Sequence, residues 1–265
     1  NNGTTVVSDS GDISTSDLTS VNTITLTNSA TLNVTQHSLV TVASGTETVT
    51  LSNTGTVTAK SVVEAYQLAD GAGNDFTTDA VGQTVTGGTG DDIITGVGGN
   101  DVILGGNGAD TITGGAGEDI LTGGTGADTF VFASTDSAAD IYSDTDFSGG
   151  LTDGDKFVGT FDIVRDFVTG TDIIDIDDSL TFFNTGYDVG EIYVDAENVK
   201  PAMTDVPLGF ALLIRGEFNE TSDQFVVDFT GGDDTMVYFD VAGTNSAIIL
   251  ENEILDASNI GVDFT

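Results

Sequence analysis

Aspartates recur every nine residues in the middle of the chain, each behind a run of glycines and two residues before a large apolar side chain. The aspartates are Asp92, Asp101, Asp110, Asp119 and Asp128, and the apolar residues are Ile94, Ile103, Ile112, Leu121 and Phe130. Carboxylate oxygens, together with the backbone carbonyls that a glycine-rich turn leaves free, are the ligands that a hard cation such as calcium prefers. The pattern therefore predicts a metal-binding array rather than a single site.

Five contiguous phrases carry this pattern from residue 87 to residue 131: GGTGDDIIT, GVGGNDVIL, GGNGADTIT, GGAGEDILT and GGTGADTFV. Glycines recur at positions 1, 2 and 4, where they permit positive φ and a turn that a residue with a Cβ would form only at a cost. We expect carbonyls of this turn to act as ligands beside the aspartate at position 6. The glycines assigned to the metal sites are Gly88, Gly90, Gly99, Gly106, Gly108, Gly115, Gly117, Gly124 and Gly126.

Two phrases form one coil of a β-solenoid, so alternate phrases belong to opposite edges. Asp92, Asp110 and Asp128 are expected on one edge, and Asp101 and Asp119 on the other. Neighbouring coils lie about 4.8 Å apart, and two carboxylates at that distance repel each other by roughly 3 kcal/mol at an effective dielectric constant of 20. A ladder of bare carboxylates should therefore not close. We expect calcium to bridge the coils, because magnesium demands stricter geometry and keeps its waters.

A degenerate phrase, DGAGNDFTT at residues 70–78, precedes the array. Asp75 lies 17 residues before Asp92, where 18 would keep the register. We interpret Asp75 as a further edge ligand, in a turn that has lost one residue.

Two features of the array depart from a uniform repeat. The second phrase has Val97 at position 2, so the carbonyl geometry beside Asp101 is expected to differ there. Asp91 and Glu118, at position 5, are expected to face solvent rather than a metal.

The five phrases resemble the calcium-binding nonapeptides of RTX (repeats-in-toxin) proteins, a family of secreted bacterial proteins. A glycine-rich linker that binds no metal would not keep an aspartate and an apolar residue in phase over successive copies. The resemblance implies a parallel β-roll with calcium between the turns on each edge. It also implies folding outside the cell, where calcium is plentiful.

A second calcium candidate lies at residues 144–155, DTDFSGGLTDGD, which follows the spacing of an EF-hand loop. Its ligands would be Asp144, Asp146, Ser148 and Asp155. Loop position 12 holds aspartate where the longer glutamate is usual, and the flanks do not resemble paired helices. The alternative interpretation is an acidic excursion on the surface.

The flanks of the array are also rich in β-strand patterns. Residues 1–69 contain much threonine in alternating runs such as NTITLT and ATLNVT, which predicts short solenoid strands, and only KSVVEAYQLA at 60–69 is helix-like. Residues 134–265 contain runs such as FALLIRG and TMVYFDV, which predict a mainly β cap. Its aromatic residues, which include Phe157, Phe161, Phe167, Phe182 and Phe183, are expected in the core. We therefore predict an all-β fold: a Thr-rich β-solenoid segment (1–69), a parallel β-roll (70–133) and a mainly β C-terminal cap (134–265).

The segment DIVRDFVTGTDIIDID at 162–177 resembles the region that follows the β-roll in secreted serralysin-type proteases and other type I secretion substrates. The tail of the chain resembles their C-terminal export regions, which are not cleaved. The resemblance implies that type I secretion machinery is a partner. It is consistent with an N-terminus, NNGTTVVSDS, that lacks the basic and apolar regions of a signal peptide.

The charge balance excludes several functions. The chain has 43 Asp and Glu residues but only five Lys and Arg, which gives a formal net charge of −38. Nucleic-acid binding and anionic membranes are disfavoured, because both depend on basic side chains. No run is long enough to span a bilayer, so membrane insertion is not expected. With no cysteine, the chain has no disulfide framework and no thiolate metal site.

Motifs for catalysis are missing from the sequence. The single histidine, His37, lies in a Thr-rich stretch, and no H-E-x-x-H, G-x-S-x-G or Walker motif occurs. We therefore expect no enzyme activity. The preferred hypothesis is a calcium-dependent, type I secreted structural protein that resembles RTX-type bacterial surface-layer proteins and self-associates at the cell surface. The alternative is an RTX carrier and secretion region for a larger adhesin or hydrolase.

Overall fold

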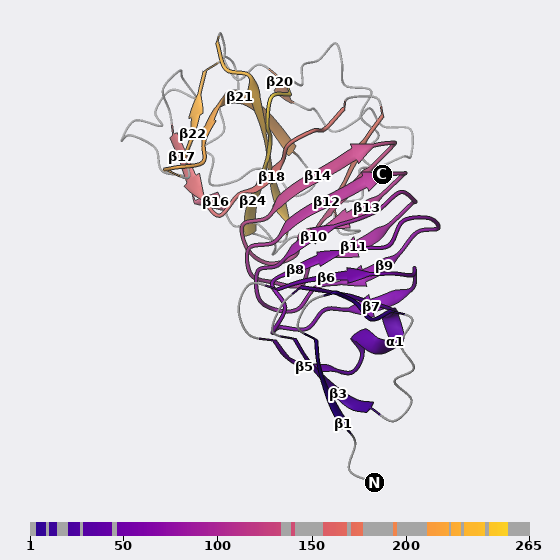
Figure 1. Ribbon diagram of the computed structural model, residues 1–265. Coiled ribbons are helices and arrows are strands. Elements are labelled where there is room, and N and C mark those ends of the chain that lie inside the picture. Colours follow the sequence, from indigo (N-terminus) through magenta and orange to yellow (C-terminus); the bar gives the residue numbers. More distant parts are fainter. Residues whose placement is uncertain are drawn as a thin grey trace.

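The protein is a parallel β-solenoid that ends in an antiparallel cap (Figure 1). The computed structural model describes residues 4–8, 11–14, 21–26, 29–43, 47–133, 139–140, 156–168, 171–176, 193–194, 211–222, 224–228, 231–241 and 244–253. The all-β prediction, with a solenoid, a β-roll and a β-rich cap in that order, is confirmed.

The threonine-rich N-terminal part forms the first coils. β1 (Thr4–Ser8), β3 (Val21–Leu26) and β5 (Val40–Ala43) make a three-stranded parallel sheet. β2 (Gly11–Asp12), β4 (Ala30–Leu32) and β6 (Thr48–Leu51) begin a second, long sheet. The one helix among the described residues is α1 (Val34–His37). The helix-like composition at 60–69 is misleading, because that stretch holds a strand, β8 (Ala65–Gln67), paired on both sides.

Two sheets face each other through the roll. The long sheet continues through β8, β10 (Thr84–Thr86), β12 (Val102–Asn107) and β14 (Ile120–Thr125). The opposite sheet contains β7 (Thr56–Thr58), β9 (Asp75–Thr77), β11 (Ile93–Thr95), β13 (Thr111–Thr113), β15 (Thr129–Phe132) and β19 (Ile173–Ile176). Successive nine-residue phrases therefore supply strands to alternate sheets, as predicted.

The interior of the roll is a column of apolar side chains, one from each strand. Ile94, Ile112 and Phe130 are in register across β11, β13 and β15, and all three are fully buried. The neighbouring outward residue Ile93 is 51% exposed, because successive side chains on a strand point to opposite faces. One hydrophobic cluster runs from Ile24 to Leu250, so the core passes without interruption from the solenoid into the cap.

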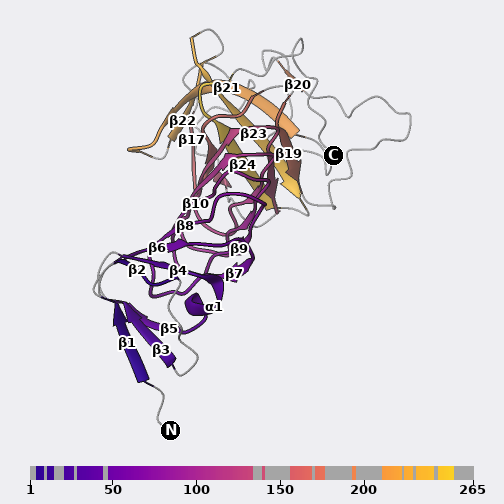
Figure 2. The same ribbon diagram turned by 45° about the vertical axis from the view of Figure 1, so that its right-hand side comes forward.

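The cap closes the open end of the long sheet. β18 (Asp162–Val164) pairs in parallel with β14 on one side and with β24 (Thr244–Leu250) on the other. Beyond β24 the sheet continues in the order β23 (Asp234–Val241), β21 (Ala211–Asn219), β22 (Gln224–Val227), β17 (Lys156–Gly159) and β16 (Ala139–Asp140), all antiparallel, while β20 (Tyr193–Val194) pairs with β21. Figure 2 shows these long strands wrapping over the last coils.

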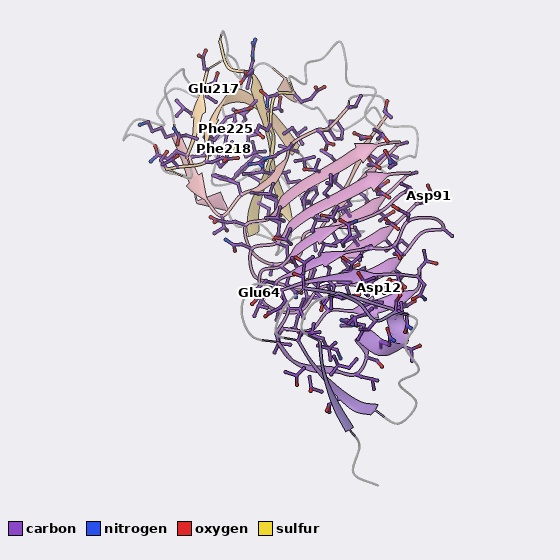
Figure 3. All side chains as sticks on the ribbon, viewed as in Figure 1. Asp12, Glu64, Asp91, Glu217, Phe218 and Phe225 are labelled. Atoms are coloured by element: carbon purple, nitrogen blue, oxygen red, sulfur yellow. The ribbon has the colours of Figure 1, made fainter. Side chains whose placement is uncertain are left out.

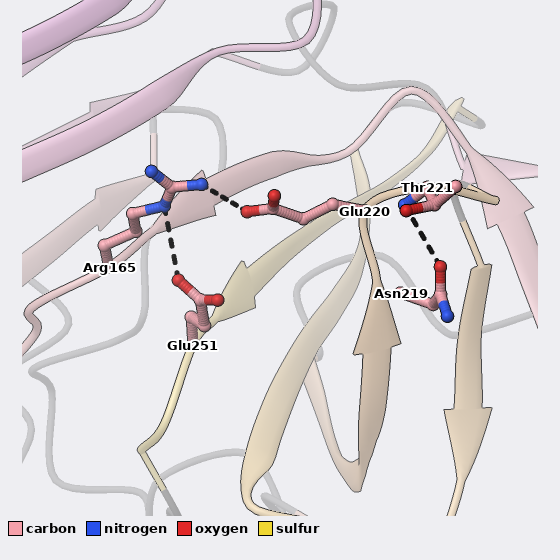
Figure 4. A network of polar contacts seen from close by, with 5 residues as sticks. All are labelled: Arg165, Asn219, Glu220, Thr221 and Glu251. Carbon is pink, nitrogen blue, oxygen red and sulfur yellow. Dashed lines mark hydrogen bonds and ion pairs between the residues drawn. The ribbon is translucent and has the colours of Figure 1, made fainter.

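Aromatic side chains form the core of the cap, as predicted for Phe157, Phe161 and Phe167, which are all buried. Phe182 and Phe183, for which the same was predicted, lie outside the described residues. At the surface, Arg165 pairs with Glu220 and its Nε lies 3.3 Å from Glu251 Oε2 (Figure 4). This cation therefore links the end of β18 to the hairpin after β21 and to the end of β24.

Strand pairing crosses both of the predicted domain boundaries. β8 pairs with β10 across residue 69, and β14 pairs with β18 across residue 133. Among the residues that the structure describes, no helix reaches the length and apolarity needed to cross a membrane.

Candidate metal centre

Each aspartate of the array stands at the end of a glycine turn, just before the strand of its phrase. On the first edge, Asp92, Asp110 and Asp128 directly precede β11, β13 and β15. The Oδ1 atom of each accepts a hydrogen bond from the backbone of the preceding coil. The distances are 2.8 Å from Asp92 N to Asp110 Oδ1 and 2.9 Å from Asp110 N to Asp128 Oδ1. The carboxylates are therefore stacked as the rungs of a ladder.

The second edge repeats this arrangement on the other side of the roll. Asp101 and Asp119 precede β12 and β14, and Asp101 N donates to Asp119 Oδ1 at 2.7 Å. Figure 3 labels Asp91, next to the first-edge ladder, and Glu64, which precedes β8 on the second edge; the two lie on opposite sides of the roll. The predicted division of the aspartates between two edges is confirmed.

The second carboxylate oxygen, Oδ2, lies against the first glycine of its own phrase. A Cβ on Gly105 would come within 2.3 Å of Asp110 Oδ2. The same conflict would occur at Gly87, Gly96, Gly114 and Gly123, at distances of 2.8, 2.9, 2.6 and 2.3 Å. None of these glycines has a positive φ, so at position 1 the glycine permits close approach and not a left-handed backbone. Glycine is required there because the aspartate and, at Gly87 and Gly96, a carbonyl oxygen of the next coil fill the space.

Carbonyl oxygens at positions 2 and 4 lie against glycines of the next coil. A Cβ on Gly106 would lie 2.4 Å from Gly88 O, and a Cβ on Gly108 would lie 2.4 Å from Gly90 O. Gly106 and Gly108 have φ values of 116° and 130°, as expected for these turn positions. In the same way, a Cβ on Gly124, Gly126 or Gly117 would clash with the carbonyl oxygen of Gly106, Gly108 or Gly99, respectively. Each edge therefore carries backbone oxygens beside its carboxylates.

The second phrase differs in the way that Val97 predicts. A Cβ on Gly115 would lie 2.6 Å from Gly96 O, so the carbonyl nearest to this glycine comes from position 1, whereas the carbonyl nearest to Gly106 comes from position 2. Val97 O accepts from Ala116 N at 3.5 Å, and the Val97 side chain is 48% exposed. The apolar side chain at this position is therefore tolerated because it points outward.

Burial makes these carboxylates costly as free anions. Asp110 is 1% exposed, and its Oδ2 has no hydrogen-bond partner in the structure. The pKa of Asp110 is raised to about 6, chiefly by burial; the Asp92 N–H opposes the shift, and the nearby charges of Asp128, Asp92 and Asp91 add to it. Burial also raises the pKa of Asp101 to about 6. Repulsion, which the spacing predicts as the main cost, is therefore secondary to desolvation.

These features fit a bound calcium ion. A buried carboxylate oxygen without a donor needs a positive partner. The available ligands are all oxygens, from carboxylates and from the carbonyls of the glycine turns, and this is the donor set that calcium prefers. The five array aspartates and their glycine carbonyls would hold the ions, with Asp91 exposed and Glu118 half-buried outside the ladders.

Asp75 does not belong to the ladder. It begins β9, pairs with Ile93 and is exposed. The residue in register with Asp92 is Asn74, whose N–H donates to Asp92 Oδ1 at 2.6 Å. The predicted loss of one residue is therefore wrong. The buried apolar residue of each phrase sets the register. Phe76 is buried, lies two residues after Asn74 and pairs with Ile94 in the sheet.

Two aspartates of the cap, which the nonapeptide pattern does not identify, extend the ladders. Asp119 N donates to Asp162 Oδ1 at 2.9 Å on the second edge, and Asp128 N donates to Asp172 Oδ1 at 3.0 Å on the first edge. Asp162 is 0% exposed and Asp172 is 6% exposed. The available signal is the aspartate two residues before a buried apolar residue, which here is Val164 or Ile174.

A third cap aspartate, Asp166, closes the last glycine turn. Its two oxygens accept from Gly123 N at 2.8 Å and from Gly124 N at 2.7 Å. These contacts satisfy backbone donors at the end of the array. The cap therefore continues the polar pattern of the roll without its glycines.

Two other groups of acidic residues are weaker candidates for a metal site. Asp144, Asp146, Ser148 and Asp155, the predicted EF-hand ligands, lie outside the described residues. In the cap, carboxylate oxygens of Glu217, Asp233 and Asp234 lie within 4.8 Å of one another, and Figure 3 labels Glu217. The Asp234 oxygens already accept from Phe218 N at 2.7 Å and Asn252 N at 2.8 Å, so that buried carboxylate has backbone donors.

His37 is part of the core. Its Nε2 lies 3.1 Å from the Tyr66 hydroxyl, and the two rings pack edge to face. Burial and then the charge of Lys60 lower the pKa of His37 to about 4, so the ring is neutral at physiological pH. Its role in the structure is packing and one hydrogen bond.

The stacked coils, buried carboxylate ladders and glycine carbonyls define a calcium-binding β-roll. Residues 82–111 and 95–130 match the family model of the RTX calcium-binding nonapeptide repeat, which spans four copies. The resemblance of the array to RTX repeats is therefore confirmed, and calcium is the ion that these repeats bind.

A similar solved structure is the solution structure of the AlgE6R3 subunit from the Azotobacter vinelandii mannuronan C5-epimerase. It is 23% identical to the chain, and the match covers 76% of this chain and 81% of that chain with a TM-score of 0.31. At this TM-score the likeness carries no argument about function. No curated protein matches the chain.

Proposed function

We propose that the protein is a calcium-dependent extracellular structural protein, which folds on calcium after type I secretion and self-associates in a bacterial surface layer. The observation that carries the calcium step is the pair of buried aspartate ladders. Asp110 and Asp101 are each 1% exposed and have pKa values raised to about 6. Burying these charges therefore destabilises the metal-free roll, and a bound cation offsets that destabilisation.

Coupling of folding to export follows from this requirement. A ligand that binds only the folded state shifts folding by mass action, so the roll stays unfolded where calcium is scarce and folds where it is abundant. An unfolded chain suits passage through a secretion channel. The RTX repeats support secretion as the route, because proteins with these repeats are typically secreted.

The surface-layer role rests on the architecture and on the sequence. The threonine-rich solenoid continues the long sheet of the roll through β6, β4 and β2 and the opposite sheet through β7, which gives a scaffold along one axis. The formal net charge of −38 favours association through divalent cations and disfavours nucleic acid and anionic membranes. No catalytic motif occurs in the sequence, and we propose no enzymatic role.

Two measurements test the proposal. Circular dichroism during a calcium titration should show a cooperative transition to β structure that a chelator reverses. Electron microscopy of the purified chain should show ordered sheets in calcium but not in chelator. A chain that is equally folded in excess chelator contradicts the calcium step. A chain that folds with calcium but stays monomeric contradicts the layer and favours a carrier region of a larger adhesin or hydrolase.

A further inference from the structure

Both ladders end in an amide at their N-terminal side. Asn74 precedes Asp92 by 18 residues, and Gln83 precedes Asp101 by 18. Each amide therefore occupies the ladder position one coil before the first aspartate of its edge. Both side chains are buried, with 4% and 2% of their surface exposed. Their backbone N–H groups donate to Asp92 Oδ1 at 2.6 Å and to Asp101 Oδ1 at 2.7 Å. The stacking contact of the ladder is therefore kept where the carboxylate is lost.

The amide groups supply donors to oxygens at these rungs. Asn74 Nδ2 donates to Asp92 Oδ1 at 2.8 Å and to Ala69 O at 3.1 Å. Gln83 Nε2 donates to Val63 O at 2.6 Å and to Lys60 O at 3.2 Å. An aspartate, which has no donor when ionised, could make none of these contacts. The Asn74 amide thus supplies a donor to one carboxylate and one carbonyl oxygen, and the Gln83 amide supplies donors to two carbonyl oxygens, whereas Asn74 Oδ1 has no hydrogen-bond partner.

The first carboxylate of the array on each edge has a donor for its second oxygen as well. Asp92 Oδ2 accepts from Gly88 N at 2.9 Å, and Asp101 Oδ2 accepts from the Thr78 hydroxyl at 3.1 Å. Asp110 Oδ2 has no such partner, although Asp110 is equally buried. Asp92 and Asp101 therefore have a donor for each carboxylate oxygen, whereas Asp110 has a donor for Oδ1 alone.

The coils at the amide rungs have a larger apolar core than the array. Tyr66 and Phe76 are buried, with ring centroids 4.9 Å apart, and Tyr66 also packs on His37. The Tyr66 hydroxyl accepts from Lys60 N at 2.8 Å. In the array the corresponding positions hold aliphatic residues until Phe130. Aromatic side chains bury more apolar area each, so these coils depend less on a ligand for stability.

We propose that Asn74 and Gln83 terminate the calcium ladders, so that strands β8, β9 and β10 (Ala65–Thr86) fold without calcium and present a preformed edge on which the roll assembles. The inference rests on the proposed calcium-dependent folding and locates its boundary. Glu64, which lies below Gln83 on the second edge, is exposed, and the Gln83 amide lies between it and Asp101. Its Oε2 accepts from Glu47 N at 3.1 Å, so the stacking contact continues below the amide.

Hydrogen exchange of the whole chain, read by mass spectrometry with and without calcium, tests the boundary. Removal of calcium should change the protection of Ala65–Thr86 by less than about twofold, and should reduce the protection of β11 to β15 by more than about tenfold. If Ala65–Thr86 loses protection together with the array, the boundary is wrong although calcium-dependent folding stands. If no segment responds to calcium, the proposed calcium-dependent folding itself is wrong.

A charge variant tests the role of the amide directly. Asn74→Asp adds a carboxylate rung below Asp92, so it should bind one more calcium ion per chain and make the protection of β9 depend on calcium. Asn53→Asp is the matched control, because Asn53 is exposed and its side-chain oxygen already accepts from Val34 N at 3.0 Å. Equal calcium binding by the two variants contradicts the proposal. If Asn74→Asp does not fold, the exchange pattern of the unmodified chain still decides.

Discussion

Asp110 borders two gaps between neighbouring carboxylates of its ladder, whereas Asp92 borders one. Replacing Asp110 should therefore remove twice as many bound calcium ions as replacing Asp92. The first edge has carboxylates at Asp92, Asp110, Asp128 and Asp172, which leaves three intervals with an acid on both sides. Asp110 borders two of them and Asp92 borders one. Asp110→Asn should remove two calcium ions per chain, and Asp92→Asn should remove one.

The energetic consequence follows from ligand linkage. At free calcium 100 times the dissociation constant, each ion stabilises the folded state by about 2.7 kcal/mol, so losing two ions costs about 5 kcal/mol. A loss of that size is comparable to the whole stability of a marginal domain, which is about 5 to 15 kcal/mol. Asparagine keeps a side-chain oxygen for the hydrogen bond from Asp92 N, so the substitution removes charge and leaves the stacking contact possible.

The assay combines a count of bound calcium with a measurement of stability. Equilibrium dialysis followed by elemental analysis gives ions per chain, and urea unfolding at fixed free calcium gives the free energy of unfolding. Asp91→Asn is the control, because Asp91 is exposed and accepts a hydrogen bond from Ala109 N at 2.9 Å beside the same ladder. Equal losses in Asp110→Asn and Asp92→Asn, or a loss of ions in Asp91→Asn, would refute the shared-rung geometry.

Three further predictions concern packing and pH. Gly105→Ala should weaken calcium binding at least tenfold, because its Cβ would lie 2.3 Å from Asp110 Oδ2, whereas Gly98→Ala, whose nearest contact would be 3.5 Å away, should bind calcium normally by calorimetry. The pKa of Asp110 is raised to about 6, so the metal-free fold binds more protons than the unfolded chain between that value and 3.8. Calcium-stripped protein should therefore gain β structure on acidification through pH 6 and lose it as the pH rises, which circular dichroism would show; a gain on raising the pH would contradict the sign. Ile112→Ala, at a fully buried site, should cost about 2 to 5 kcal/mol in urea unfolding with calcium present. The exposed Ile93→Ala should cost less than about 0.5 kcal/mol.

Periodicity is sufficient to predict the architecture of the roll. A count of nine places every second phrase on the same sheet, and the apolar residue at position 8 marks the side chain that faces inward. The alternation of Asp92 and Asp101 between two edges follows from these two facts. They are local, repeated properties of the chain, so every copy of the phrase reinforces the same register.

The position of Asp75 outside the ladder shows that core packing, and not the preference for an acidic ligand, sets the register. Asn74 is the last residue before β9 and Asp75 is the first residue of that strand, and chemistry favours the acid as a metal ligand. The register is set by the core, because the buried Phe76 must take the place that Ile94 takes one coil later. A register shift by one residue would turn Phe76 outward. Burial of an aromatic side chain thus outweighs the preference for a carboxylate at the edge.

Asp162 and Asp172 were missed for a different reason. They pair with Asp119 and Asp128, which lie 43 and 44 residues earlier, so no constant interval connects them to the array. Their turns also lack the paired glycines that mark positions 1 and 2. Only the three-dimensional continuation of β14 into β18 and of β15 into β19 brings these carboxylates onto the edges.

The two oxygens of each aspartate have separate functions, and this separation explains the composition of the ladders. Oδ1 accepts the backbone N–H of the preceding coil at Asp101, Asp110, Asp119 and Asp128, and this contact needs only an oxygen. Oδ2 lies in the space left by the first glycine, where its negative charge is useful only if a cation is bound. An amide such as Asn74 lies in the same ladder and gives its backbone N–H to the next rung, but it carries no charge to attract an ion. Replacement of aspartate by an amide can therefore stop metal binding without stopping the stacking of coils, and the solenoid can continue below the array along the same two edges.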